Sequence, residues 1–209
     1  MTDTPIDTSA LPPLPRGPAD HSVRNQIVDA ATEHFSLYGY EKTTVSDLAK
    51  AIGFSKAYVY KFFDSKQAIG EVICGNCLAQ MRQAVDEAVA GADSATERLR
   101  RLFATLAEAG SRLFFQDRKL YAIAVVACEE QWGSARAYDA HMQQLILQIV
   151  REGREAGEFE RKTPLDETAH AIYLVMKPYL DPLQLQYNLD FVEVAPAQLS
   201  NLILRSLAP

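Results

Sequence analysis

The feature that most constrains this chain is the segment from Thr44 to Phe63, which has the pattern of two short helices around a tight turn. Thr44 can cap the first helix, and Asp47 three positions later completes a capping-box pattern. Gly53 provides the left-handed turn that commonly ends a helix, and Ser55 can cap a second helix that runs to about residue 63. The first helix has one apolar stripe at three- to four-residue spacing, formed by Val45, Leu48, Ala49 and Ile52. The segment therefore predicts a helix-turn-helix.

The second helix of this pair separates apolar from polar side chains. Its inward face would hold Val59, Phe62 and Phe63. Its outward face would hold Lys56, Tyr58, Tyr60 and Lys61. Between residues 42 and 66, five lysines stand against two aspartates, a local net charge of +3 in a chain whose net charge is −6. Because a basic island in an acidic protein is an electrostatic footprint for phosphate, the sequence predicts that the second helix enters the major groove of double-stranded DNA.

Two other interpretations compete with this one. A helix-turn-helix also occurs as plain helical packing in enzymes and binding proteins. Against an enzyme, the sequence contains no H-E-x-x-H zinc motif, no G-x-S-x-G nucleophile elbow, no P-loop and no dinucleotide-binding fingerprint. The four histidines, at positions 21, 34, 141 and 170, are scattered. We therefore predict no enzymatic activity, no cofactor and no metal.

The second competing interpretation is a redox-responsive regulator. Cys74 and Cys77 have the C-x-x-C spacing of redox sites and half-zinc sites. They fall inside a long helical pattern, with no second pair and no nearby histidine. We interpret them as small, partly buried helix residues and keep the thiol switch as the alternative.

The rest of the chain has helical periodicity, so we expect an all-α fold. Residues 1–20 hold five of the ten prolines without periodicity and should form a disordered tail. Residues 21–66 would form the helix-turn-helix domain and residues 67–209 a second helical domain, with a helix over 65–89 connecting them. Further helices are expected from 94, and over about 118–131, 135–156, 163–180 and 196–207.

No segment is suited to crossing a membrane. The longest apolar run, at 120–128, has nine residues, whereas a spanning helix needs about 20. The N-terminus lacks the basic start and apolar stretch of a signal peptide. We expect a cytoplasmic protein with no membrane partner.

Several runs of residues resemble the DNA-binding domain of the TetR (tetracycline-repressor-like) family of bacterial regulators. They are Ala30-Ala31 with Phe35 and Tyr38-Gly39, then Thr43 to Ala49, then Gly53 to Phe63, followed by Asp64-Ser65-Lys66. The resemblance implies a homodimer that presents its third helices to a pseudo-palindromic operator. It also implies a C-terminal domain for ligand binding and dimerisation, in which a small-molecule effector releases the repressor from DNA.

Residue roles on DNA follow from chemistry and from this resemblance. Thr44, at a helix N-terminus, can offer its hydroxyl and backbone N–H to a phosphate. Tyr60 and Lys61 match positions that usually touch the DNA backbone, and Lys66 can pair with phosphate as a point charge. Base edges would meet the start of the third helix, where Tyr58 departs from the small residue expected. The residues at this start are Ser55, Lys56, Ala57 and Tyr58.

The C-terminal region is rich in large apolar groups, which line pockets between helices as well as cores. Our first candidates for the effector site are Phe103, Tyr121, Trp132, Met142, Tyr173 and Met176. For the dimer interface, the helices over about 165–180 and 196–207 would form a four-helix bundle with their copies. Its predicted contact residues are Leu199, Leu202 and Ile203.

Overall fold

The computed structural model describes residues 18–209, and within that range every regular element is a helix. The predicted all-α fold is confirmed. The helices are α1 (Pro18–Tyr38), α2 (Val45–Ile52), α3 (Lys56–Val59), α4 (Lys66–Ala90), α5 (Ala95–Gln116), α6 (Arg118–Glu129), α7 (Gly133–Glu155), α8 (Leu165–Leu180), α9 (Pro182–Leu185), the 3-10 helix η1 (Leu189–Phe191) and α10 (Ala195–Ser206).

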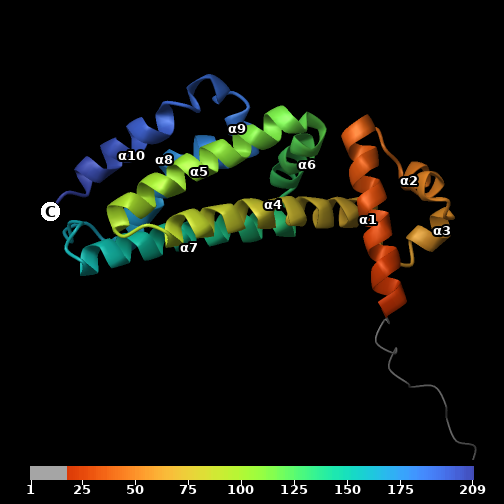
Figure 1. Ribbon diagram of the computed structural model, residues 1–209, viewed down its shortest axis with the longest axis horizontal. Coiled ribbons are helices and arrows are strands. Elements are labelled where there is room, and N and C mark those ends of the chain that lie inside the picture. The colour runs from red at the N-terminus through yellow and green to blue at the C-terminus, as the bar shows by residue number, and fades with distance from the viewer. Residues whose placement is uncertain (1–17) are drawn as a thin grey trace, which may run out of the picture.

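The molecule is elongated, with a small head at one end of a larger helical body (Figure 1). Helices α1, α2 and α3 form the head. The long helix α4 leaves the head and runs beside α7 through the body, while α5 crosses above them and α10 packs against α5. Helix α4 is therefore the continuous rod that joins the head to the body.

The first helix begins earlier than the sequence predicts. Helix α1 starts at Pro18, so residues 18–20 belong to a helix and not to the predicted tail over 1–20. Proline is well suited to the first turn of a helix, where its missing N–H has no intrahelical partner to lose. The rest of the predicted tail, residues 1–17, lies outside the described residues.

Two apolar cores hold the molecule together. The body core collects residues of α4, α5, α7, α8 and α10. The head core collects residues of α1 to α4, and it also includes Ile123 and Ala127 of α6 and Trp132 at the start of α7. Because the head shares its core with α6 and α7, its packing extends past the boundary at residue 66 that the sequence suggests.

Two helices of the body are capped by glutamates that are distant in sequence. Trp132, which precedes α7, makes no side-chain cap. The carboxylate of Glu71 on α4 instead accepts hydrogen bonds from the backbone N–H groups of Gly133 (3.0 Å) and Ser134 (3.1 Å). Glu158 serves the start of α5 in the same way, through Ala95 and Thr96. A carboxylate at a helix N-terminus satisfies free N–H groups and complements the helix dipole.

Candidate DNA-binding head and effector cavity

The helix-turn-helix is built by the caps that the sequence predicts. The Thr44 hydroxyl oxygen accepts the Asp47 backbone N–H at 3.2 Å, and the Asp47 carboxylate accepts the Thr44 backbone N–H at 2.9 Å. The Thr44 hydroxyl also donates to the Asp47 carboxylate at 2.6 Å. These hydrogen bonds lower the pKa of Asp47, with the Thr44 side chain as the largest cause. The hydroxyl that the sequence offers to a phosphate is therefore already bonded within the cap.

A glycine makes the turn between α2 and α3 possible. Gly53 has φ of 79°, in the left-handed region that other residues enter at a cost. Ser55 caps the next helix by accepting the Tyr58 backbone N–H at 3.1 Å. Helix α3 then ends at Val59 and not near Phe63 as predicted, because residues 60–62 continue as hydrogen-bonded turns.

Three half-buried aromatic rings form a row along α3, and two of them, Phe54 and Phe62, pack against the head core. Tyr58 packs edge-to-face against Phe54, with ring centroids 5.0 Å apart, and against Phe62, with centroids 5.3 Å apart. Tyr58 is half-buried as the middle ring of this row, and the Lys61 ammonium lies 5.5 Å from its ring centroid. Such contacts hold aromatic rings in defined orientations. Tyr58 is thus fixed at the start of the helix that would meet DNA.

Most of the predicted DNA-binding residues lie on the exposed surface of the head. This set is Thr44, Ser55, Lys56, Ala57, Tyr60 and Lys61. Lys66 is different, because its ammonium donates to the Tyr40 backbone carbonyl at 3.0 Å and lies 4.2 Å from the centroid of the Tyr40 ring. The Lys66 ammonium therefore binds the loop before α2. This geometry does not support the predicted contact between Lys66 and a DNA phosphate.

Aromatic contacts also join the head to the body. The Tyr40 ring packs edge-on against Trp132, with centroids 5.6 Å apart, and against Phe35 on α1. Trp132 is 1% exposed, and its indole N–H donates to the Glu130 carboxylate at 2.8 Å. Burial, followed by the charge of Glu130, raises the pKa of Tyr40 to about 12. Trp132 is thus part of the joint between head and body.

A second, polar connection links the end of α1 to the start of α6. The Ser36 hydroxyl donates to the Asp117 carboxylate, and the Lys119 ammonium donates to the Leu37 backbone carbonyl. Asp117 is also the N-cap of α6, where it accepts the backbone N–H groups of Lys119 and Leu120. These bonds tie the start of α6 directly to the end of α1.

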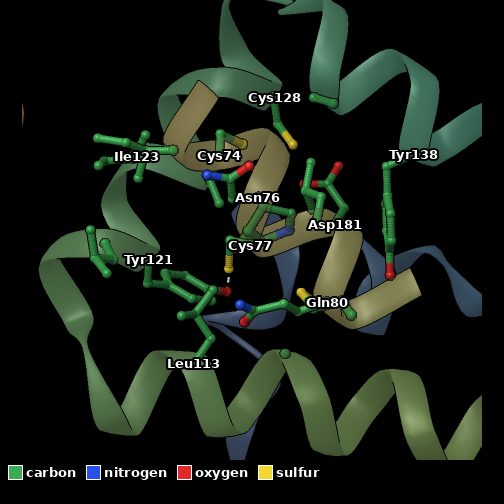
Figure 2. A pocket seen from close by; sticks show the side chains of 18 of the residues that line it. Cys74, Asn76, Cys77, Gln80, Leu113, Tyr121, Ile123, Cys128, Tyr138 and Asp181 are labelled. Atoms are coloured by element: carbon green, nitrogen blue, oxygen red, sulfur yellow. Dashed lines mark hydrogen bonds between the residues drawn. The ribbon is translucent and has the colours of Figure 1, made fainter. Parts of the chain in front are cut away.

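A cavity of about 480 Å³ lies where the head meets the body. This volume is within the range of sites for drug-sized ligands, roughly 300–1,000 Å³. Cys77 and Gln80 of α4 project into it, with Tyr121 and Cys128 of α6 and Tyr138 of α7 around them (Figure 2). Helix α1 contributes Val28, Asp29 and Thr32 to the same wall, and the segment after α8 contributes Asp181, Pro182, Leu183 and Leu185.

All three cysteines of the chain line this cavity. Burial is the main cause that raises the pKa of Cys74 to about 11 and of Cys128 to about 12, and burial also raises the pKa of Cys77. Reactive cysteines have lowered pKa values in electropositive, partly exposed surroundings. These thiols stay protonated at neutral pH, so the redox interpretation of Cys74 and Cys77 is not favoured.

The lining of this cavity differs from the effector site that the sequence predicts. Of the six candidates, the structure places only Tyr121 on the cavity wall. Trp132 belongs to the head core, and the other four lie in the body core: Phe103, Met142, Tyr173 and Met176. Large apolar residues at helical spacing fill cores, whereas the cavity walls include many smaller side chains. The signal in the sequence that points to this wall is the pair Cys74 and Cys77 on the helix over 65–89.

The predicted dimer residues also divide between two faces of α10. Ile203 is 7% exposed and packs in the body core, and Leu199 is half-buried against the same core. Leu202 is 63% exposed. Residues four apart share one stripe of a helix, so Leu199 and Ile203 turn inward together while Leu202 faces outward. Ile203, which the sequence predicts at the dimer interface, instead packs in the core of its own subunit.

Within residues 18–209, no three or more histidine, cysteine or acidic side chains are grouped so that they could hold a metal ion. No helix in that range is both long and apolar enough to span a membrane.

Comparison with curated proteins finds relatives of the head. Residues 27–72 match the family model for bacterial regulatory proteins of the tetR family. The uncharacterised HTH-type transcriptional regulator YhgD of Bacillus subtilis is 36% identical over 63 residues, which cover 30% of this chain and 33% of that protein. The biofilm operon negative regulator IcaR of Staphylococcus aureus is 43% identical over 49 residues, 23% of this chain and 26% of that protein. The matches thus span a third or less of these relatives.

Comparison with solved structures covers nearly the whole chain. Thermus thermophilus FadR, a TetR-family transcriptional repressor solved with lauroyl-CoA, superposes with a TM-score of 0.62 at 24% identity, over 89% of this chain and 95% of that chain. At this identity the likeness shows a shared fold. Residues 95–191 also match the family model for the tetracyclin repressor-like C-terminal domain. With family models matching both the head and the body, the chain belongs to the TetR family of bacterial transcriptional regulators.

Proposed function

We propose that this protein is a transcriptional repressor, not an enzyme, which binds a DNA operator as a homodimer and leaves it when a small molecule occupies the cavity. The head supports the DNA part of the proposal. Its exposed lysines and hydroxyls lie around the N-terminus of α3, in a local field of positive charge. Such groups position a protein on phosphates, while side chains at the start of the helix read bases.

The observation that carries the ligand part is the composition of the cavity wall. Val28, Asp29 and Thr32 come from α1, the first helix of the head, and the facing residues come from α4, α6 and α7 of the body. A molecule bound there touches both parts at once. Because its contacts depend on how the head sits against the body, its binding and the position of the head are coupled.

Two relatives give this reading of the cavity its context. IcaR is named as a negative regulator, and Thermus thermophilus FadR is described as a repressor in complex with lauroyl-CoA. By analogy with these two proteins, we infer that this protein represses transcription and that a small molecule controls it. A DNA partner also implies that this protein acts in the bacterial cytoplasm.

A homodimer would give the two heads that a palindromic operator requires. Large apolar side chains are exposed on α8, at Leu174 and Val175, and on α10, at Leu202. Buried against a second copy, they would leave water. In sedimentation at low micromolar concentration we expect a mass of about twice 23.2 kDa. A monomer at that concentration would contradict the dimer.

The DNA proposal is tested with the region upstream of the protein's own gene. Fluorescence anisotropy with that fragment and with a scrambled fragment of equal length should give at least tenfold tighter binding to the former, with affinity falling steeply as salt rises. Equal affinity for both fragments would reduce the head to a nonspecific binder. Adding an organic extract of the host cells should then release the protein from the specific fragment. The weak binding to the scrambled fragment should not change.

A further inference from the structure

The chemistry of the cavity wall restricts what the effector can be, on the basis of the function proposed above. Tyr138 of α7 is the most informative residue. The residue lines the cavity and is 9% exposed, and its hydroxyl oxygen is enclosed without a hydrogen-bond partner among residues 18–209. In Figure 2 its ring stands along one side of the pocket, with the hydroxyl end directed toward the part of α4 that carries Gln80. An unpaired buried hydroxyl is costly, so a ligand that moves the neighbouring side chains aside and accepts a hydrogen bond from it is favoured.

The tyrosine hydroxyl keeps its proton. Burial raises the pKa of Tyr138 far above neutrality, with smaller contributions from Cys77 and Asp86. The hydroxyl can therefore donate one hydrogen bond to a carbonyl or ether oxygen. The other tyrosine of the wall has no such capacity to spare, because the Tyr121 hydroxyl already donates to the Pro182 backbone carbonyl at 2.8 Å.

The charged residues of the wall are unsuited to an anion. Three aspartates, at 29, 139 and 181, stand against two cations, Lys177 and Arg136. The Arg136 guanidinium donates to the Gln131 backbone carbonyl, and the Lys177 ammonium lies 5.6 Å from the Tyr173 ring centroid. A ligand with a carboxylate or a phosphate would therefore face a wall of net negative charge. It would find no cluster of basic side chains free to pair with it.

Two of the three aspartates already have hydrogen-bond partners in the protein, and the third, Asp29, is exposed on α1. The Asp139 carboxylate accepts hydrogen bonds from the Tyr173 hydroxyl and from the Gln143 amide, and the Asp181 carboxylate accepts the Leu183 backbone N–H. The remaining wall is largely apolar, and the three neutral thiols within it behave as small hydrophobic groups. The carboxylates of Asp139 and Asp181 are thus already hydrogen-bonded within the protein, and apolar contact dominates the space that is left.

We propose that the cavity takes an uncharged, largely apolar small molecule with one hydrogen-bond acceptor, such as a medium-chain ketone or ester. The Tyr138 hydroxyl donates to that acceptor. The chain or ring of the molecule packs against the cysteine, leucine and isoleucine side chains of α4 and α6, and it reaches the α1 residues of the head.

Three probes that share a ten-carbon chain but differ in head group test this assignment. Calorimetric titration of the full chain with 2-decanone, decanoate and decyltrimethylammonium at pH 7.5 should rank 2-decanone at least tenfold tighter than either ion. Equal or tighter binding of decanoate or of the ammonium ion overturns the assignment. Absence of 2-decanone binding overturns it as well.

A pair of tyrosine variants tests the role of the hydroxyl. Tyr138→Phe removes an unpaired group and should fold as stably as the wild type, yet bind 2-decanone about five- to tenfold more weakly, as expected for one lost hydrogen bond. Tyr121→Phe removes a hydroxyl from the same wall that is already bonded within the protein, and should leave the affinity unchanged within about twofold. Equal effects of the two variants overturn the Tyr138 assignment.

Failure of this inference is distinguishable from failure of the proposed function. If 2-decanone binds through Tyr138 but does not release the specific DNA fragment, the assigned ligand class stands and the effector role of the cavity is wrong. If instead decanoate releases the fragment, ligand-controlled repression stands and the assigned ligand class is wrong.

Discussion

Trp132 occupies the space in which a side chain at Gly70 would lie. A Cβ atom on Gly70 would be 2.8 Å from Cη2 of Trp132 and 2.9 Å from Cε2 of Tyr40. Gly70 belongs to the connecting helix α4, Tyr40 to the head and Trp132 to the start of α7. Three parts of the molecule therefore meet at one point, and they do so because position 70 has no side chain.

Gly70→Ala is expected to disturb this joint. Alanine favours a helix over glycine by about 1 kcal/mol, but overpacking a rigid core costs about 1–3 kcal/mol. We expect a net loss of up to about 2 kcal/mol in the free energy of unfolding, because neither aromatic ring can move without displacing the head core. Urea unfolding followed by the fluorescence of Trp132, the single tryptophan of the chain, measures both stability and the environment of the ring.

Gly75→Ala is the matched control on the same helix. A Cβ there meets nothing nearer than the Cβ of Ser134 at 3.8 Å, an ordinary contact. This variant should raise the free energy of unfolding by about 0.5–1 kcal/mol through helix propensity alone. If both alanine variants shift stability in the same direction, close packing at Gly70 is not what holds the joint.

The sequence predicted the head far better than the cavity, for a physical reason. The caps at Thr44 and Ser55 and the turn at Gly53 depend on interactions within a few residues, so local patterns identify them. Whether a buried residue faces a core or a cavity depends on contacts distant in the chain. Trp132 illustrates this: the sequence predicts it in the effector site, and its place in the head core against Gly70 and Tyr40 could not follow from helical spacing. Lys66 likewise has its charge placed by the Tyr40 carbonyl, a partner outside its own helix.

Lys61 and Lys66 should have different effects on DNA binding. Lys61 is exposed, and we expect Lys61→Ala to weaken binding about equally for all DNA sequences while reducing the slope of log affinity against log salt by about one. Lys66→Met should leave that slope unchanged and instead lower the free energy of unfolding by about 1.5–3 kcal/mol, the typical loss of a hydrogen bond from a charged group. Anisotropy titrations over a salt series, with unfolding curves for each variant, separate the roles. A reduced slope for Lys66→Met would restore it as a phosphate contact.

Glu71 should stabilise the start of α7 from a distance. Partial burial acts to raise its pKa, but the backbone N–H groups of Ser134 and Gly133 outweigh burial and lower the pKa from 4.5. Glu71→Ala should therefore cost about 1–2 kcal/mol at pH 7, as the loss of a helix cap does. Glu87→Ala is the control, since Glu87 is exposed on the same helix and bonds only with Gln83 among the described side chains.

The contribution of Glu71 should depend on pH in a defined direction. A carboxyl whose pKa is lower in the folded state than in the unfolded state stabilises the fold at pH values above its unfolded-state pKa. This stabilisation is lost as the pH falls through the folded-state pKa. The stability difference between wild type and Glu71→Ala should therefore be constant from pH 7 to about 5 and should narrow below 4.5. A difference that persists unchanged at pH 3 would show that the charge of Glu71 is not what caps α7.

The cavity thiols should make the stability of the fold sensitive to alkali, and they should be unreactive at neutral pH. The pKa of Cys74 is raised from 9.0 to about 11 and that of Cys128 to about 12, mainly by burial. Since the unfolded chain loses these protons first, stability should hold below pH 9 and fall as pH rises toward 11.

At pH 7.5, iodoacetamide should label the native cysteines at least tenfold more slowly than the urea-unfolded chain, because the thiolate is the nucleophile. Mass spectrometry of the labelled peptides measures each site. Equal labelling of Cys77 in native and unfolded protein would mean that its thiol is accessible and ionised, and would return the redox switch as an explanation of how this regulator responds.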